Sequence, residues 1–154
     1  MSFYEQIIEF LTSNNIWYEE TSHEPVFTSQ QASEVRGGGV LEMGAKALIF
    51  GKEEVTMFVL RGVDKVDSSK AKKLIAVKDL PLAKPERVKE VTGVEIGAVA
   101  PFGFLVGIKT FVDKSLLKGE YIYFNPGKHD KTIKMKSSDY GAITSINLDE
   151  FAKE

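Results

Sequence analysis

A glycine-proline segment near the middle of the chain has the residue pattern most suited to chemistry. It is Gly97-Ala-Val-Ala-Pro-Phe-Gly103, between two apolar stretches. Glycine lets the backbone adopt a positive φ or approach a ligand closely, while Pro101 fixes its own φ and has no N–H to donate. Such a rigid loop can expose amides that hold an anion or a developing oxyanion. An ordinary tight turn before a strand explains the same residues, so other stretches must decide.

Lys46 is the second candidate for chemistry. It lies in Gly44-Ala-Lys-Ala-Leu-Ile49, where its neighbours are small or apolar. A lysine in this position either extends its ammonium group into solvent or points it into a cleft. In a cleft it would be a fixed cation that orients an ester or phosphate oxygen. The local sequence leaves both alternatives open.

Polar residues in two turns are weaker candidates. His129 and Asp130 follow Asn125-Pro-Gly127, and this turn could aim a polar group toward the loop at Gly97. A lone histidine in a turn is equally compatible with an ordinary surface position. Thr28 and Ser29 are good helix caps, which is a sufficient explanation for them.

Missing motifs narrow the possible chemistry. The 154 residues include no cysteine and only two histidines, which excludes disulfides and thiolate nucleophiles and disfavours a histidine-rich metal centre. The sequence contains no G-x-S-x-G, H-E-x-x-H or G-x-x-x-x-G-K-[ST] motif. A metal site made of carboxylates stays open. An enzyme made of these residues is expected to use water and electrostatics rather than a covalent intermediate, and we expect no cofactor.

The elements that must position these residues are a mixture of helices and strands. Expected helices begin at a cap or a proline and cover 3–14, 28–36, 67–75 and 85–92, with a short polar helix closing the chain. Expected strands cover 16–21, 45–50, 55–61, 77–82, 110–112, 121–124 and 132–135, and 142–148 is a last apolar run. Because strands and helices do not alternate strictly, we expect an α+β fold with a mixed, mostly antiparallel sheet or barrel-like core surrounded by short helices.

Composition sets outer limits on the protein. A chain of 154 residues that is 43% hydrophobic and 27% charged is expected to form one soluble domain spanning residues 1–154. No apolar run is long enough to span a bilayer, and the first residues do not resemble a signal peptide. We therefore expect a cytoplasmic protein with no membrane partner. The formal net charge of −2 argues against coating nucleic acid, but not against a local basic patch.

Several motifs in one order resemble a known family. They are His23-x-Pro25 with Thr28, Ser29 and Ala32; Lys46 opening a hydrophobic strand; Gly97-x-x-x-Pro101 with Phe102 and Gly103; Val112-Asp113 before Leu116-Leu117; and Asn125-x-Gly127-x-His129. This series resembles the YbaK/ProX family of aminoacyl-tRNA deacylases, which are related to the editing domain of bacterial prolyl-tRNA synthetases. The resemblance covers roughly residues 20 to 148, nearly the whole chain.

The resemblance implies hydrolysis of the ester that joins a small wrong amino acid, such as alanine or cysteine, to the end of tRNA(Pro). The resemblance also implies that Lys46 holds the terminal nucleotide and that the loop from Gly97 to Pro101 borders the aminoacyl pocket. Our own hypothesis is that the catalytic groups are Lys46 and the backbone amides of Gly97, Ala98 and Val99, which would stabilise the oxyanion. The residues expected to border the substrate are Phe27, Thr28, Ser29, Pro101, Phe102, Gly103, Asn125, Gly127, His129 and Asp130. Ala47, which follows Lys46, occupies a position at which several members of the family carry a polar residue.

The tRNA itself is expected to be held through lysines. Candidate phosphate contacts are Lys70, Lys72, Lys73, Lys128, Lys131, Lys134 and Lys136. A solvated surface is the ordinary alternative for any one of them. Because the net charge is slightly negative, prolyl-tRNA synthetase or an elongation factor is expected to assist capture of the aminoacyl-tRNA. The oligomeric state is not predicted.

Two other functions are compatible with the same residues. A binding module could hold a nucleotide or a tRNA acceptor end without hydrolysing it, using the same loop and Lys46. A hydrolase could instead act on a small ester other than aminoacyl-tRNA. A turnover assay with mischarged tRNA separates the binding module from the deacylase. Loss of activity when the tRNA is trimmed to a bare aminoacyl nucleoside would count against the hydrolase of a small ester.

Overall fold

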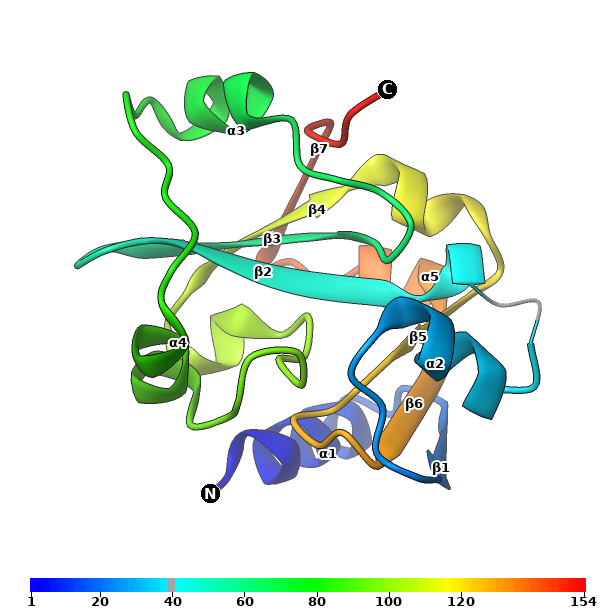
Figure 1. Ribbon diagram of the computed structural model, residues 1–154. Coiled ribbons are helices and arrows are strands. Elements are labelled where there is room, and N and C mark those ends of the chain that lie inside the picture. The colour runs from blue at the N-terminus through cyan, green and yellow to red at the C-terminus, as the bar shows by residue number, and fades with distance from the viewer. Residues whose placement is uncertain (39–40) are drawn as a thin grey trace.

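The computed structural model describes residues 1–38 and 41–154, and its helices lie around two β-sheets (Figure 1). The helices are α1 (Phe3–Ser13), α2 (Ser29–Val35), α3 (Ser68–Ile75), α4 (Pro85–Thr92) and α5 (Ser137–Gly141). The strands are β1 (Tyr18–Ser22), β2 (Ala45–Gly51), β3 (Val55–Arg61), β4 (Lys109–Asp113), β5 (Tyr121–Phe124), β6 (Lys131–Lys136) and β7 (Ile146–Asp149). Short 3-10 helices are η1 (Leu41–Met43), η2 (Gly103–Val106) and η3 (Lys114–Lys118). This arrangement confirms the predicted α+β class.

The larger sheet has four strands in the order β2-β3-β4-β7. The predicted hairpin pairs β2 with β3, and Lys46 lies opposite Leu60. The pairings of β3 with β4 and of β4 with β7 are parallel. Met57 and Val59 belong to one hydrophobic core and Phe58 and Leu60 to a second, so β3 is buried on both faces. The strand β2 lies at the edge of this sheet.

The smaller sheet has three antiparallel strands in the order β1-β6-β5. Ile122 and Phe124 of β5, together with Ile133 and Met135 of β6, are buried in the main core. Because strand side chains alternate between faces, the residues between them lie on the opposite, outer face. A single parallel bridge between residues 44 and 123 joins the two sheets.

Caps define the helices largely as the sequence predicts. Ser2 and Glu5 form a capping box at α1, and the Thr28 hydroxyl accepts the amide of Gln31 at the start of α2. Asp67 caps α3 in the same way. At α4, Pro85 occupies the first turn and residue 93 ends the helix in a left-handed conformation. None of the helices in the described residues is long and apolar enough to cross a membrane.

Two local predictions are wrong. Segment 77–82 forms no strand and contributes only an isolated bridge between Leu82 and Phe50, because most of its residues are exposed and have no face to bury. The end of the chain is not a helix. Phe151 is buried, and the Asp113 carboxylate accepts the amides of Phe151 and Ala152 at 2.8 and 3.0 Å. Burial alone would raise the pKa of Asp113, but bonds from Ser115 and these two amides hold it below its ordinary value.

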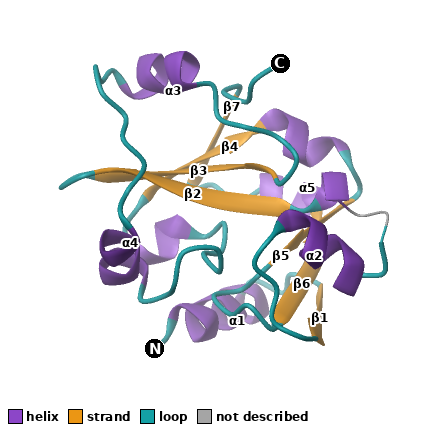
Figure 2. Cartoon of the chain, viewed as in Figure 1, coloured by secondary structure: helices purple, strands orange, loops and turns teal. Residues whose placement is uncertain are grey.

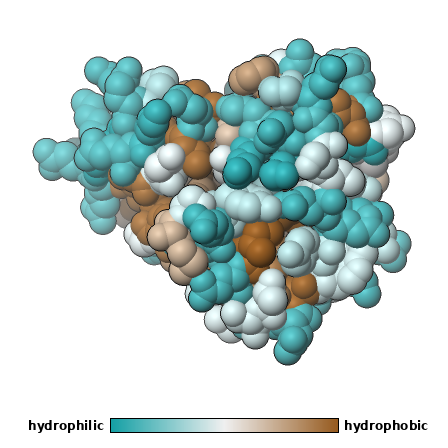
Figure 3. Space-filling view, turned by 90° about the horizontal axis from the view of Figure 1, so that it is seen from below, coloured by the Kyte–Doolittle hydropathy of each residue, from teal (hydrophilic) through white to brown (hydrophobic). Residues whose placement is uncertain are grey.

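Loops rather than regular elements carry most of the candidate residues. Segments 93–102 and 125–130 are such loops (Figure 2). Seen from below, hydrophobic side chains form separate patches between hydrophilic ones (Figure 3). The large apolar side chains that remain exposed include Phe27 at 69% and Leu82 at 53%. Single exposed apolar side chains are ordinary on a protein surface, so the position of Phe27 has meaning only together with the residues around it.

Candidate active site

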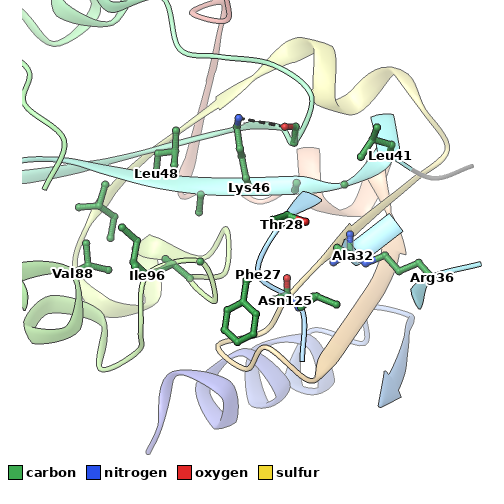
Figure 4. Close-up of a pocket in the computed structure, with 18 of the residues that line it drawn as sticks. Phe27, Thr28, Ala32, Arg36, Leu41, Lys46, Leu48, Val88, Ile96 and Asn125 are labelled. Atoms are coloured by element: carbon green, nitrogen blue, oxygen red, sulfur yellow. Dashed lines mark hydrogen bonds between the residues drawn. The ribbon is translucent and has the colours of Figure 1, made fainter. Parts of the chain in front are cut away.

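A cavity of about 230 Å³ lies along the open edge of β2 (Figure 4). Its walls come from β2, the segment before α2, α2 itself, α4 and the loop after α4. The lining residues are Val26, Phe27, Thr28, Ala32, Arg36, Leu41, Gly44, Ala45, Lys46, Ala47, Leu48, Ile49, Gly62, Leu82, Val88, Ile96, Gly97, Val99 and Asn125. Apolar side chains dominate this lining, so the cavity is an apolar space with a few polar groups.

Lys46 lines this cavity with its amine already bonded. The amine donates to the carbonyl of Gly62 at 3.3 Å and to that of Asp64. In Figure 4, Lys46 and Leu48 project to one side of β2, while Phe27 and Thr28 lie on the other. Burial lowers the pKa of the Lys46 amine below its ordinary value, although the charge of Asp64 opposes this shift.

The first part of the glycine-proline loop reaches the cavity. Gly97 is exposed and has a φ of +94°, which only glycine adopts without strain. The amides of Gly97 and Val99 donate to no acceptor within residues 1–38 and 41–154. The amide of Ala98 donates to the Glu95 carbonyl at 3.1 Å, and Ala98 does not line the cavity. Gly97 and Val99, two of the three predicted backbone donors, therefore line the cavity with amides that have no acceptor among the described residues.

The second part of the loop lies in the core instead of bordering the cavity. The carbonyl of Pro101 accepts the buried Tyr140 hydroxyl at 2.6 Å. Phe102 is fully buried, with its ring centroid 5.3 Å from that of Phe124. A Cβ added to Gly103 would lie 2.8 Å from Oγ1 of Thr110. These three predicted substrate residues thus anchor the loop in the core and do not line the cavity.

His129 joins three of the predicted segments without lining the cavity. Its Nδ1 lies 3.0 Å from the carbonyl of Val26, so a hydrogen bond there requires a proton on Nδ1. The His129 ring lies 4.5 Å from the Phe27 ring. A Cβ on Gly97 would come within 3.4 Å of the His129 Cε1 atom. His129 therefore positions Phe27 and the neighbouring loop.

The remaining predicted residues divide between the cavity wall and its surroundings. Thr28 and Asn125 line the cavity, and the Asn125 side chain donates to the Lys131 carbonyl at 2.9 Å. Ser29 is the first residue of α2. Gly127 has a φ of +81° beside Val94, and the carbonyl of Asp130 accepts the His23 amide at 2.9 Å. Gly127 and Asp130 shape the turn and do not line the cavity.

Arg36 is a polar group of the wall that the sequence did not identify. It was interpreted only as the end of a helix, although a cation beside a run of glycines is a weak signal for a ligand site. Its Nε donates to Oγ1 of Thr132 at 3.1 Å, and its guanidinium lies 5.8 Å from the centre of the Tyr123 ring. Burial lowers the Arg36 pKa to about 10. Within residues 1–38 and 41–154, no ion pair involves Arg36.

The described part of the cavity wall is poor in ionisable side chains. No histidine, aspartate or glutamate is among the lining residues that the structure describes. Over residues 1–38 and 41–154, no three His, Asp or Glu side chains are grouped so that they could hold a metal ion. The polar groups that remain are a lysine, an arginine, a threonine, an asparagine and backbone amides.

Comparisons with known proteins match this chain over most of its length. Residues 23–143 match the family described as the aminoacyl-tRNA editing domain. The chain is 30% identical over 156 residues to the multifunctional Ser/Thr-tRNA deacylase ProXp-y of Escherichia coli K12, covering 97% of this chain and 93% of that protein. It is 31% identical over 91 residues to a proline--tRNA ligase of Brachyspira hyodysenteriae, covering 58% of this chain and 16% of the ligase.

The fold is also found among solved structures. One, described as a candidate trans-editing enzyme for prolyl tRNA synthetase, superimposes with a TM-score of 0.83 at 22% identity, covering 100% of this chain and 99% of that one. The resemblance predicted from the order of the motifs is thereby confirmed. The chain belongs to the family of aminoacyl-tRNA editing domains.

Proposed function

We propose that this chain is a cytoplasmic trans-editing enzyme that hydrolyses the ester between tRNA(Pro) and a small wrong amino acid, alanine or cysteine. The observation that carries this proposal is a small apolar cavity lined by Lys46, Gly97 and Val99, with no carboxylate, histidine or cysteine in the lining that is described. An aminoacyl ester is already activated, so such a site needs only to position water and stabilise a tetrahedral oxyanion.

The proposed reaction uses backbone donors. Water attacks the ester carbonyl carbon and gives up a proton, and the carbonyl oxygen becomes an oxyanion. Collapse then breaks the bond to the ribose oxygen, which takes up that proton and leaves as a hydroxyl. The free amides of Gly97 and Val99 are the donors for the oxyanion. One well-placed donor lowers the barrier by about 3 kcal/mol, or roughly a hundredfold in rate. The neighbouring hydroxyl of the terminal ribose helps to deliver the water.

Lys46 is proposed to hold the nucleotide end of the substrate. Its amine is bonded to neutral carbonyls and makes no ion pair among the described residues. A phosphate oxygen attracts an ammonium group more strongly than a carbonyl does. We therefore expect the amine to exchange these carbonyls for the phosphate when substrate binds.

Selectivity in this proposal is steric. Ala32, Ala47 and Val99 bring apolar surface to the wall, and a cavity of about 230 Å³ is small for a ligand pocket. One methylene changes binding by only about 1–3 kcal/mol. The enzyme should therefore tolerate more than one small side chain while it excludes larger ones.

Serine and threonine are a second candidate pair of substrates. The E. coli relative is named as a Ser/Thr-tRNA deacylase, and Thr28 and Asn125 bring polar groups to the same cavity. Either side chain could pair with a substrate hydroxyl. If the substrate hydroxyl is recognised in this way, serine should be released faster than alanine.

The deciding experiment is a panel of tRNA(Pro) species charged with Ala, Cys, Ser, Thr or Pro and scored for release of the amino acid. Fastest release of Ala or Cys supports the main proposal, and fastest release of Ser or Thr supports the second. Release from none of them, with tRNA still bound, would show a binding module that does not hydrolyse. Adding prolyl-tRNA synthetase or an elongation factor tests whether either assists capture, as the net charge of −2 leads us to expect.

Lys46→Ala tests the role of the cation. We expect kcat/KM for the best substrate of the panel to fall by about a hundredfold, because a charge-assisted bond of roughly 3 kcal/mol is lost. The melting temperature should change little, since the amine is bonded only to two loop carbonyls. The matched control is Lys52→Ala, an exposed lysine at the tip of the same hairpin, which should retain full activity. Near-normal turnover by the Lys46 variant would refute its role.

A further inference from the structure

The outer face of the three-stranded sheet carries aromatic and basic side chains that begin at the cavity. Tyr121 and Tyr123 alternate along β5 with residues buried in the core, so both lie on the outer face. Their register partners on β6 are Lys136 and Lys134. Trp17 precedes β1, and its ring centroid lies 5.9 Å from that of Tyr121. We call Trp17, Tyr121, Tyr123, Lys134 and Lys136 the aromatic strip.

Arg36 connects this strip to the cavity. Its guanidinium lies over the ring of Tyr123, 5.8 Å from the centroid, and Arg36 also lines the cavity. Figure 4 shows Arg36 extending from the end of α2 on the same side of β2 as Asn125. Its guanidinium is half-buried and has no carboxylate partner among the residues described. A half-buried cation without a counter-ion is a ready binding site for an anion.

Cations and rings alternate along the strip itself. The Lys134 amine lies 4.2 Å from the centre of the Tyr121 ring and 5.8 Å from that of Tyr123. Glu19 of β1 faces Lys134 across the sheet, but no ion pair in the described parts of the chain uses Lys134 or Lys136. The positive groups of the strip are therefore available to a ligand, whereas the overall charge of the chain is −2.

We propose that the aromatic strip binds the single-stranded 3′ end of the RNA whose last nucleotide enters the cavity. Bases stack on Tyr123, Tyr121 and Trp17, while Arg36 and Lys134 contact the phosphates between them. This inference rests on the proposed function, because that function brings an RNA end to the cavity. Residues two apart on a strand are about 7 Å apart, a separation that an extended single strand can match. Aromatic side chains interleaved with cations are the usual means of holding unpaired nucleotides.

Binding changes the contacts of Lys134 in a defined way. Its amine now covers the ring of Tyr121, and a stacked base needs that same surface. The base therefore displaces the amine onto the adjacent phosphate, where a charge-assisted bond replaces a cation–π contact. Duplex RNA cannot make these contacts, since its bases are not exposed for stacking.

The test uses uncharged RNA, so that it does not depend on hydrolysis. The probes are a fluorescent RNA hairpin with four unpaired 3′ nucleotides and the same hairpin with a blunt end, followed by anisotropy. Wild-type protein should bind the first probe at least roughly tenfold more tightly than the second. Equal affinity for both would overturn the proposal.

Variants locate the binding to the strip. Trp17→Ala combined with Tyr121→Ala should weaken binding of the unpaired end by about tenfold or more. Tyr121 is only half exposed, so its replacement also changes packing, and Lys134→Ala is therefore the second variant. It should weaken binding and reduce the salt dependence of binding by about one phosphate contact. The matched control is Lys109→Ala, whose amine lies 5.3 Å from the Phe111 ring on the other sheet. Unchanged binding in both strip variants, or equal loss in the control, would contradict the proposal.

A short substrate separates this inference from the proposed function. An ester of the amino acid with the ribose of adenosine 5′-monophosphate lacks the nucleotides that would contact the strip. Strip variants should therefore hydrolyse it as fast as the wild type does. Their KM for full-length aminoacyl-tRNA should rise. If the wild type hydrolyses neither substrate, the proposed function fails, and the anisotropy result still decides the strip. If strip variants lose turnover of the short substrate while remaining folded by circular dichroism, the strip is part of the cavity and the inference is wrong.

Discussion

The two halves of segment 97–103 have different roles, although they form one motif in the sequence. Gly97 and Val99 face the cavity and keep their amides free of acceptors within the described residues. Pro101, Phe102 and Gly103 are buried and are tied to the core through their carbonyl and their packing. Gly97 is exposed, whereas Val99 is itself buried, at 7% exposure. The first half therefore differs by lining the cavity and by having two amides without an acceptor among the described residues, and the second half fixes the position of those amides.

This difference shows how a backbone site is made rigid. An amide in a loop is a useful donor only if the loop does not move during the reaction. Here the rigidity comes from an aromatic cluster, in which the Phe102 ring packs against Phe10, Phe104, Phe124 and Tyr140. Substitutions at Pro101, Phe102 and Gly103 should therefore change stability first, and substitutions in the cavity-lining half at Gly97 and Val99 should change activity first.

Gly103→Ala should have the largest effect on stability. The new Cβ would lie 2.8 Å from Oγ1 of Thr110 and 3.0 Å from the Met57 side chain. Overpacking of this kind lowers the free energy of unfolding by about 2–3 kcal/mol, which urea denaturation measures. Gly119→Ala is the control, because its φ of −81° suits any residue and its new Cβ would meet Met43 at an ordinary 3.6 Å. A Gly103 variant as stable as the wild type would mean that the buried half is not tightly packed.

Gly97→Ala should have a smaller effect on stability and a selective effect on activity. A φ of +94° is strained for alanine, which costs about 1–2 kcal/mol. Relief of that strain moves the Gly97 amide, so we expect deacylation to fall at least roughly tenfold.

Gly93→Ala is the matched control for this prediction. Residue 93 has a φ of +78° with no atom near its added Cβ, and it does not line the cavity. Its alanine variant should lose similar stability and keep its activity. If both variants lose activity equally, general destabilisation explains the loss and the cavity-lining half of the loop has no special role.

The sequence predicts the local elements well because their signals are local. The caps at Ser2, Thr28 and Asp67 and the hairpin of 45–61 lie where expected, since each depends on residues close together in the chain. Segment 77–82 has the composition of a strand, but it forms only one bridge, to Phe50. Whether such a run becomes a strand depends on a partner edge that local composition does not reveal.

The site was predicted only in part, for the same reason. Lys46, Gly97 and Asn125 could be chosen from their motifs, and all three line the cavity. Arg36 and Val88 could not, because they reach it only through the packing of α2 and α4 along the edge of β2. Likewise, the sequence does not show that Pro101 is buried whereas Gly97 is exposed. The position of Pro101 depends on residues far away in the chain, such as Tyr140, whose hydroxyl donates to the Pro101 carbonyl.

Tyr140→Phe tests the link between the two halves. The Tyr140 hydroxyl is buried and donates to the Pro101 carbonyl at 2.6 Å, and burial raises its pKa above its ordinary value. Removing it leaves a buried carbonyl without that donor, so the free energy of unfolding should fall by about 1–2 kcal/mol. Tyr4→Phe is the control, because its hydroxyl bonds Glu20 at an exposed position and should matter little. If Tyr140→Phe also lowers kcat while its KM and fold are unchanged, the buried carbonyl positions the Gly97 and Val99 amides. Unchanged kcat would mean that packing around Phe102 is sufficient to hold them.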